Sequence, residues 1–108
     1  MRLLSRIEEI ILLAIWRLKD NAYGITIREE VGRATGKSWL TGAIYASLSR
    51  MLNNGLVISF EGEPTKERGG RRKILYRLTE EGQKALLKIK RINDINWEGL
   101  TDFEVSEQ

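Results

Sequence analysis

The chain of 108 residues contains no cysteine and no histidine, and these absences exclude several classes of protein. Without cysteine there are no disulfides and no thiolate metal sites. Without histidine the commonest general base and the commonest metal ligand are both missing. The remaining carboxylates, Lys, Tyr, Ser and Thr form no recognisable catalytic constellation. We therefore expect a protein that is not an enzyme and that uses no metal or cofactor.

Long apolar runs are also missing. No uninterrupted apolar segment approaches the roughly 18 residues of a membrane span. Glu8 and Glu9 interrupt the apolar N-terminal segment, and no small-residue cleavage site follows it. We therefore expect a cytoplasmic chain with one domain and a modest core.

Charge is distributed unevenly along the sequence. Residues 1–78 hold 14 Lys and Arg against 8 Asp and Glu, whereas residues 79–108 hold 4 against 7. The basic part suits a polyanion, and the acidic end would repel one. An ordinary solvated surface explains the same charges, so charge alone does not assign a function.

The apolar pattern predicts a first helix that begins at a capping box, Ser5–Glu8. Its core stripe has helical spacing and consists of Ile7, Ile10, Ile11, Ala14, Ile15 and Leu18. Leu12, Leu13 and Trp16 fall outside this stripe, so the helix must be covered on more than one side. A second subunit or a later helix of the same chain would provide that cover.

Two further helices follow, separated by a glycine-containing turn. The second should span about residues 24–34 and end at residues 35–37. Residues 39–40 are expected to form a strand of one or two residues, and Thr41 is expected to cap the third helix. The third helix, which stops at residues 54–55, turns four apolar residues inward: Ile44, Leu48, Met51 and Leu52.

After residue 55 the pattern changes from helix to strand. Residues 56–60 and 73–78 predict two strands, joined by a turn-like segment over residues 62–70. Thr79 caps a last helix whose first turn carries two glutamates. The apolar residues of that helix are Ala85, Leu86, Ile89, Ile92 and Ile95.

This order of elements is typical of a winged helix-turn-helix, mainly α with a β-hairpin (α+β). We expect a DNA-binding domain over residues 1–78, a dimerisation helix over residues 79–97, and an acidic tail over residues 98–108 that frays.

The third helix is the candidate for reading DNA, because its outward face is small at its N-terminal end. Small residues allow a helix to enter the major groove, where Thr or Ser can reach base edges and Ala can contact a thymine methyl group. A solvated face is the alternative, although such faces usually carry more charge. The outward residues are Thr41, Gly42, Ala43, Ala46, Ser49, Arg50 and Asn53.

The predicted hairpin tip carries the densest positive charge in the sequence. It places five cations and one carboxylate around two glycines: Lys66, Glu67, Arg68, Gly69, Gly70, Arg71, Arg72 and Lys73. Glycine permits positive φ, and arginine on a tight loop can enter a minor groove or contact flanking phosphates. The alternative is a solubilising loop that protects the sheet edges.

Several segments in this order resemble the PadR family of bacterial transcriptional regulators over about residues 3–95. The matching segments are Tyr23-Gly24, Gly42–Tyr45, Leu48–Leu52, Gly55–Val57, Gly69–Lys73, Tyr76–Thr79 and, after two glutamates, Gly82. The chain resembles the short subfamily, which has a single C-terminal helix. It departs from the family at Ala46, where a proline is frequent.

The resemblance implies a winged helix whose wing is Gly69–Lys73, with Tyr45 near the DNA backbone. It also implies a homodimer on an inverted-repeat operator, acting as a repressor. From the surplus apolar surface on the first and last helices, we expect the dimer contact to use Leu12, Trp16, Leu86, Ile89 and Ile92.

Some short members of the family bind a small aromatic ligand between the subunits. Trp16 and Trp97 are candidates for lining such a site here, although plain dimer packing explains them as well. The competing function is a winged-helix module that binds another protein and not DNA.

Overall fold

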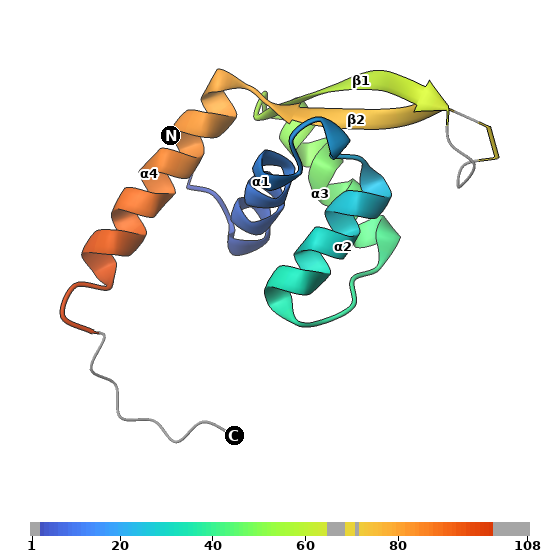
Figure 1. The fold of residues 1–108 in the computed structure, drawn as a ribbon. Helices are drawn as coiled ribbons and strands as arrows, with labels where there is room; N and C mark the ends of the chain where they lie inside the picture. Colours follow the sequence, from blue (N-terminus) through green and yellow to red (C-terminus); the bar gives the residue numbers. More distant parts are fainter. Residues whose placement is uncertain (1–2, 65–68, 71, 101–108) are drawn as a thin grey trace.

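The structure of the protein is a computed structural model that describes residues 3–64, 69–70 and 72–100. Within these residues the expected order of helices and hairpin is confirmed (Figure 1). The elements are α1 (Arg6–Leu18), the 3-10 turn η1 (Lys19–Asn21), α2 (Gly24–Thr35), α3 (Thr41–Asn53), β1 (Val57–Pro64), β2 (Arg72–Leu78) and α4 (Glu80–Asn96). The fold is a winged helix-turn-helix of the α+β class.

The capping box that the sequence predicts at the start of α1 is present. The Ser5 hydroxyl accepts a hydrogen bond from the Glu8 amide at 3.2 Å, and the Ser5 amide donates to a Glu8 carboxylate oxygen at 2.8 Å. Two amide groups at the helix start are thereby satisfied. At the other end of α1, Lys19 adopts a positive φ of 54° and the chain continues into η1.

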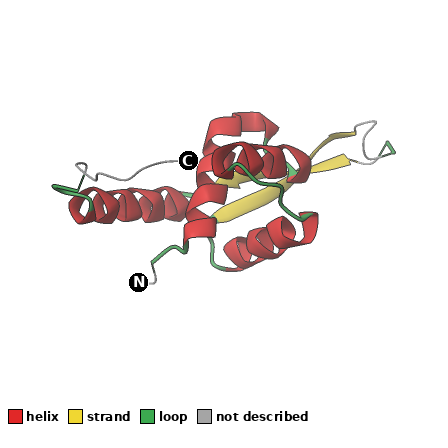
Figure 2. Ribbon diagram, turned by 90° about the horizontal axis from the view of Figure 1, so that it is seen from below, coloured by secondary structure: helices red, strands yellow, loops and turns green. Residues whose placement is uncertain are grey.

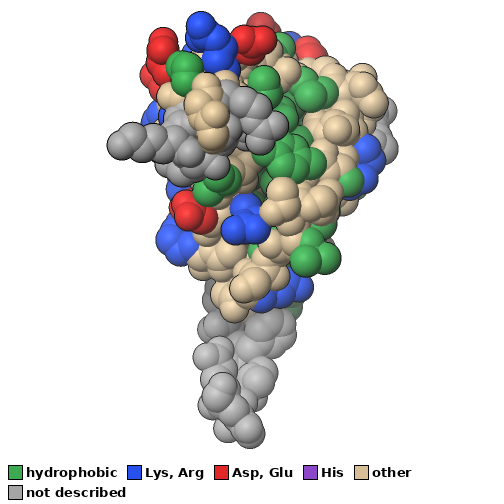
Figure 3. Space-filling view, turned by 90° about the vertical axis from the view of Figure 1, so that its right-hand side faces the viewer, with side chains coloured by type: hydrophobic (Ala, Val, Ile, Leu, Met, Phe, Trp, Pro, Cys, Tyr) green, Lys and Arg blue, Asp and Glu red, His purple; other side chains and the backbone are tan. Residues whose placement is uncertain are grey.

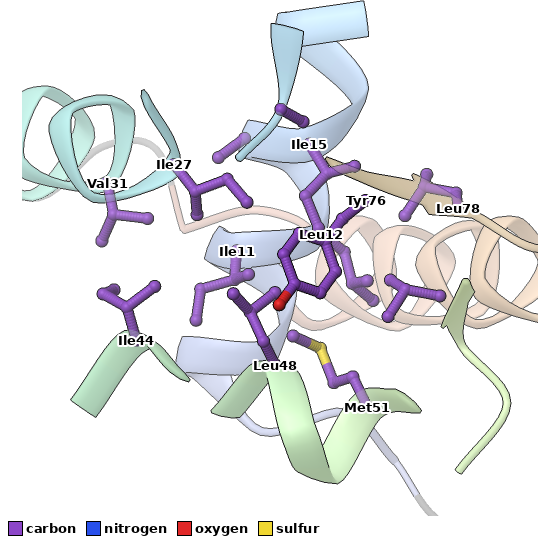
Figure 4. Packing of buried hydrophobic residues seen from close by; sticks show 13 residues of the cluster. Ile11, Leu12, Ile15, Ile27, Val31, Ile44, Leu48, Met51, Tyr76 and Leu78 are labelled. Atoms are coloured by element: carbon purple, nitrogen blue, oxygen red, sulfur yellow. The ribbon is translucent and has the colours of Figure 1, made fainter. Parts of the chain in front are cut away.

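Helix α1 lies at the centre of the core and contacts α2, α3, α4 and β2. Figure 4 shows Ile11 and Leu12 among side chains from α2, α3 and β2. Leu12 is fully buried within this one chain. Its expected place at a dimer interface is therefore wrong, because the chain's own elements cover α1 on several sides.

The hairpin packs one face on the core. β1 and β2 are antiparallel, with Val57 opposite Leu78 and Ser59 opposite Tyr76. Val57, Tyr76 and Leu78 are buried. The expected strand at residues 39–40 is absent, and Tyr23 instead forms an isolated bridge with β2. The outer edge of β2 is thus paired with a segment distant in sequence.

Helix α4 begins in close contact with the loop after α3. Thr79 caps it as predicted, accepting from the Gly82 amide at 3.0 Å and donating to the Gly55 carbonyl oxygen at 2.6 Å. A Cβ atom at Gly82 would lie 2.2 Å from the Leu56 carbonyl oxygen, so any larger residue would force the backbone apart. From this fixed start α4 extends past the body of the molecule (Figures 1 and 2).

None of the helices in the described part of the chain is both long enough and apolar enough to cross a bilayer.

An ion-pair cluster joins α1 to α2 at the surface. Glu30 of α2 accepts hydrogen bonds from Arg33, at 2.6 Å, and from Arg17 of α1. The bonds from Arg33 and then from Arg17 lower the pKa of Glu30 from 4.5 to about 2, although burial opposes the shift. The charged carboxylate is therefore favoured in the folded chain.

Replacing Glu30 by Gln should reduce the free energy of unfolding by about 1 kcal/mol at pH 7, because the two arginines are largely exposed and solvent weakens such pairs. The lowered pKa makes this stabilisation complete above about pH 4.5 and progressively lost toward pH 2. Urea unfolding at pH 7, 4.5 and 3 measures the difference from the unmodified chain.

The control is Glu29→Gln, which changes an exposed carboxylate on the same helix. A difference for Glu30→Gln that stayed constant from pH 7 to pH 3 would contradict the assignment of the stabilisation to the carboxylate.

Candidate nucleic-acid interface

The segments that the sequence assigns to DNA binding lie on the side of the molecule away from α4 (Figure 1). They are α3 and the end of the hairpin that lies far from α4. Figure 3 views the molecule from this side and shows Lys and Arg side chains next to exposed hydrophobic ones.

The outward face of α3 agrees with the sequence-based expectation. Its inward side is buried through Ile44, Ser47, Leu48 and Met51. The exposed residues are Thr41, Gly42, Ala43, Ala46, Ser49, Arg50 and Asn53. Arg50 is the first charged residue of the helix, and it donates to the Ser47 hydroxyl at 2.9 Å. The first two turns therefore present a small, uncharged surface.

The turn before α3 is fixed by local hydrogen bonds. Gly36 ends α2 in the left-handed region, with φ 74°, and its amide donates to the Gly32 carbonyl oxygen at 2.8 Å. The Thr35 hydroxyl donates to the Val31 carbonyl oxygen and accepts from the Trp39 indole, both at 2.8 Å. These bonds hold the turn in one conformation without help from strand pairing.

Thr41 was expected to cap α3, and this expectation is wrong. Leu40 occupies the N-cap position, and Thr41 is the first residue of the helix. The Thr41 hydroxyl instead accepts from the Arg28 guanidinium at 2.9 Å. This bond between α2 and α3 takes the hydroxyl away from a capping role and places a cation beside the start of the reading face.

Tyr45 is half-buried and crosses the start of α2. A Cβ atom at Gly24 would lie 1.9 Å from the Tyr45 hydroxyl oxygen and 2.5 Å from the adjacent ring carbon. The glycine is therefore needed for the aromatic ring to pack there. The Tyr45 ring thus packs against Gly24 where α2 begins. A position of Tyr45 near the DNA backbone stays a prediction.

Only part of the wing lies among the described residues. Lys66, Arg68 and Arg71 lie outside them. Gly69 and Gly70 adopt positive φ values of 63° and 86°, as the turn prediction requires.

The two described cations of the wing differ in their surroundings. Arg72 is exposed and lies 3.9 Å from the Glu61 carboxylate. Lys73 is half-buried, with its ammonium group 4.6 Å from the centre of the Tyr23 ring. The wing therefore meets the start of α2 through Lys73, while Arg72 faces solvent.

Two cations next to α3 were missed in the sequence. Arg28 reaches Thr41, and Lys37 lies 4.9 Å from the centre of the Trp39 ring. Both lie within the helix-turn-helix segment, one before and one after the end of α2. The sequence could have indicated them, because Arg28 lies in the second predicted helix and Lys37 lies in the turn that leads to the third.

A second feature, a groove of about 560 Å³, lies between α1 and α4. Leu13 and Trp16 of α1 line it together with Leu86 and Leu87 of α4. Trp16 is 51% exposed, and Leu87, which sequence reasoning overlooked, is 64% exposed.

The groove does not bring Trp16 and Trp97 together within one chain. Trp97 follows α4 and is not among the residues that line the groove. Gln83 lies beside Trp16, and the 14 residues from Gln83 to Trp97 correspond to roughly 21 Å of helix. The groove lining does reach Asn93 and Asp94, about one helical turn before Trp97. A site shared by both rings stays a prediction.

Comparison with known proteins agrees with this geometry. The family model described as "Transcriptional regulator PadR-like family" matches residues 11–88. No match is found among curated proteins.

The solved structures that resemble this chain include three regulators of similar length. A transcriptional regulator from Clostridium thermocellum is 26% identical, with 92% of this chain and 93% of that chain covered and a TM-score of 0.69. A PadR family transcription regulator from Clostridium difficile is 30% identical, with coverages of 89% and 91% and a TM-score of 0.60. A PadR-like transcriptional regulator from Bacillus cereus, 21% identical with coverages of 91% and 93%, is similar in fold, with a TM-score of 0.71.

The contact between Gly24 and Tyr45 leads to a prediction about stability. Gly24→Ala should lower the free energy of unfolding by about 1 to 3 kcal/mol, the usual cost of overpacking. The same change in a Tyr45→Ala background should cost nothing further, because the obstructing ring is gone. Urea unfolding at one fixed protein concentration measures the four chains of this cycle.

Gly42→Ala is the matched control, because Gly42 also lies in a first helical turn but a Cβ atom there would have no neighbouring atom within 4 Å. It should stabilise the chain by up to about 1 kcal/mol. Equal effects of Gly24→Ala with and without the Tyr45 ring would show that the contact does not constrain the helices.

Proposed function

Because the chain belongs to the PadR-like family of transcriptional regulators, we propose that it regulates transcription by binding duplex DNA as a homodimer. In this proposal α3 enters the major groove and the hairpin tip contacts flanking phosphates. The observation that carries it is the exposed, uncharged face of α3 between Arg28 and Arg50. Small side chains permit close approach to the bases, and cations beside them can position the backbone.

The homodimer is supported by the apolar surface of α4. Leu86, Ile89 and Ile92 are only half-buried in a single chain, and Leu87 and Ile95 are more than 60% exposed. Helix α4 packs mainly on α1 and on the end of β2, which leaves most of its circumference uncovered. A second copy of the chain, with Trp16 of α1 contributing, would bury these residues.

An operator that binds such a two-fold symmetric dimer would have the same two-fold symmetry. Each α3 would read one half-site, and the half-sites would form a near-palindrome about one helical turn apart or slightly more. We propose repression as the outcome, since a bound dimer can obstruct transcription.

We also propose that a small aromatic effector can bind between the subunits. The groove at Leu13, Trp16 and Leu87 has a volume within the range of about 300 to 1,000 Å³ that is usual for small ligands. Trp97, which is not among the residues that line the groove, would join it from the partner subunit. An aromatic compound that quenches tryptophan fluorescence and lowers DNA affinity would support this step.

The DNA-reading proposal predicts that Ala43→Glu abolishes specific binding while the chain stays folded. The carboxylate would clash in the groove and repel phosphates, whereas the core contacts of α3 lie on its opposite face. Footprinting on a duplex selected from a random pool, together with a melting curve, measures both effects. Ala34→Glu, on an exposed position of α2, is the matched control and should keep the footprint.

The wing should respond differently from α3. Neutralising Arg71 and Arg72 should weaken specific and non-specific DNA binding alike and reduce the dependence of affinity on salt. If neither Ala43→Glu nor removal of the wing charges affects DNA binding, the competing function, a winged-helix module that binds another protein, would be favoured.

The dimer proposal predicts that Ile89→Gln with Ile92→Gln yields monomers or unfolded chains. Amides at both positions would place polar groups in an apolar interface. Light scattering at micromolar concentration measures the molar mass. Lys84→Gln with Arg91→Gln changes two exposed residues of the same helix and should leave the dimer intact. A folded monomer of the unmodified chain would contradict the proposal.

A further inference from the structure

Leu40 is the most exposed large hydrophobic residue of the described chain, with 81% of its surface accessible. A single exposed leucine is ordinary on a protein surface, so exposure alone indicates nothing. The position of this one is unusual, because it immediately precedes the helix that the proposed function places in the major groove.

The backbone at Leu40 is held in place from both sides. Its carbonyl oxygen accepts from the amides of Ala43, at 3.1 Å, and Ile44, at 3.3 Å. Before it, the Trp39 indole is hydrogen-bonded to Thr35, and after it, Thr41 is bonded to Arg28. The leucine side chain therefore projects from a fixed turn.

The surroundings of Leu40 are apolar at the centre and cationic at the edge. Ala43, one turn along α3, is exposed, and Gly42 has open space around it. Arg28 and Lys37 flank the turn. Leu40 is not among the residues that line the groove between α1 and α4. A dimer built on α4 would thus leave it uncovered.

The side chains of the first two turns of α3 restrict how bases can be read there. Bidentate recognition of guanine uses Arg or Lys, and that of adenine uses Asn or Gln. Residues 41–48 contain none of these types, and the Thr41 hydroxyl is already bonded to Arg28. The C5-methyl group of thymine is the apolar feature that the major groove offers to a leucine or an alanine.

We propose that Leu40 and Ala43 form a specificity-determining contact with thymine C5-methyl groups, one such contact in each half-site. The inference rests on the proposed function and deepens it: it states by which chemistry α3 selects its sequence. Arg28 and Lys37 would hold the phosphates on either side of the thymine, which keeps the two apolar side chains against its methyl group.

The test removes single methyl groups from the DNA. In a duplex that the full chain selects from a random pool, each thymine is replaced in turn by deoxyuridine, which differs only by that methyl group. At one thymine of each half-site the replacement should weaken binding by about 3- to 5-fold, the effect of one buried methyl group. Replacing both symmetric thymines should weaken binding by about 10- to 20-fold.

Leu40→Ala should show a smaller difference in affinity between the thymine and the deoxyuridine duplexes, because only the Ala43 part of the contact remains. Leu3→Ala, which shortens another exposed leucine, is the matched control and should retain the difference. A melting curve confirms that Leu40→Ala folds, as expected for so exposed a residue.

Two results would overturn the inference and leave the proposed function standing. One is a selected duplex in which no thymine methyl group affects affinity. The other is a Leu40→Ala chain that still distinguishes thymine from deoxyuridine as the unmodified chain does. Failure to select any duplex would overturn the proposed function, and with it the inference.

Discussion

The burial of α1 on several of its sides is the packing interaction on which the rest of the molecule depends. Ile11 and Leu12 lie at full burial between α2, α3 and β2, while Leu13 and Trp16 of the same helix line the groove against α4. One helix thus contacts both the elements of the candidate DNA surface and the element of the candidate dimer surface. Because protein interiors are close-packed, the candidate DNA surface and the candidate dimer surface cannot shift independently of each other within one chain.

Glycine residues then allow close contacts between neighbouring elements, which the burial of apolar side chains alone does not specify. Gly24 admits the Tyr45 ring between α2 and α3, and Gly82 admits the Leu56 carbonyl oxygen at the start of α4. Gly36 turns the chain between α2 and α3 in a left-handed conformation. Gly24 and Gly82 both lie within segments by which the sequence resembles its family. The structure gives a geometric reason for glycine at each position, because a Cβ atom there would disturb the contact with Tyr45 or with Leu56.

The sequence predicts well what depends on neighbouring residues. The capping box at Ser5, the cap at Thr79 and the outward face of α3 follow from local spacing, and all three are present. The failures involve contacts distant in sequence. The sequence indicates that α1 is covered on more than one side, but it does not tell whether a second subunit or the same chain provides the cover. For Leu12 the cover comes from elements of the same chain.

The expected roles of residues 39–41 failed for the same reason. Tyr23, and not residues 39–40, pairs with β2. The Thr41 hydroxyl accepts a hydrogen bond from Arg28 of α2 and does not cap α3. Leu40 and Leu87 were overlooked because the pattern placed Leu40 in a short strand and left Leu87 outside the apolar face of the last helix. Their exposure, which only the folded chain reveals, is what makes them informative about partners.

The tight packing around α1 also limits how an effector could act in the proposed dimer. A ligand or a partner helix in the groove would press on Leu13 and Trp16, but the turn before α3 is fixed by its own hydrogen bonds. The reading face of a single subunit would therefore change little. What the groove can set is the angle at which α4 of one subunit meets the other, and hence the distance between the two α3 helices. Since half-site spacing is fixed by the pitch of DNA, a small change in that distance is sufficient to weaken binding.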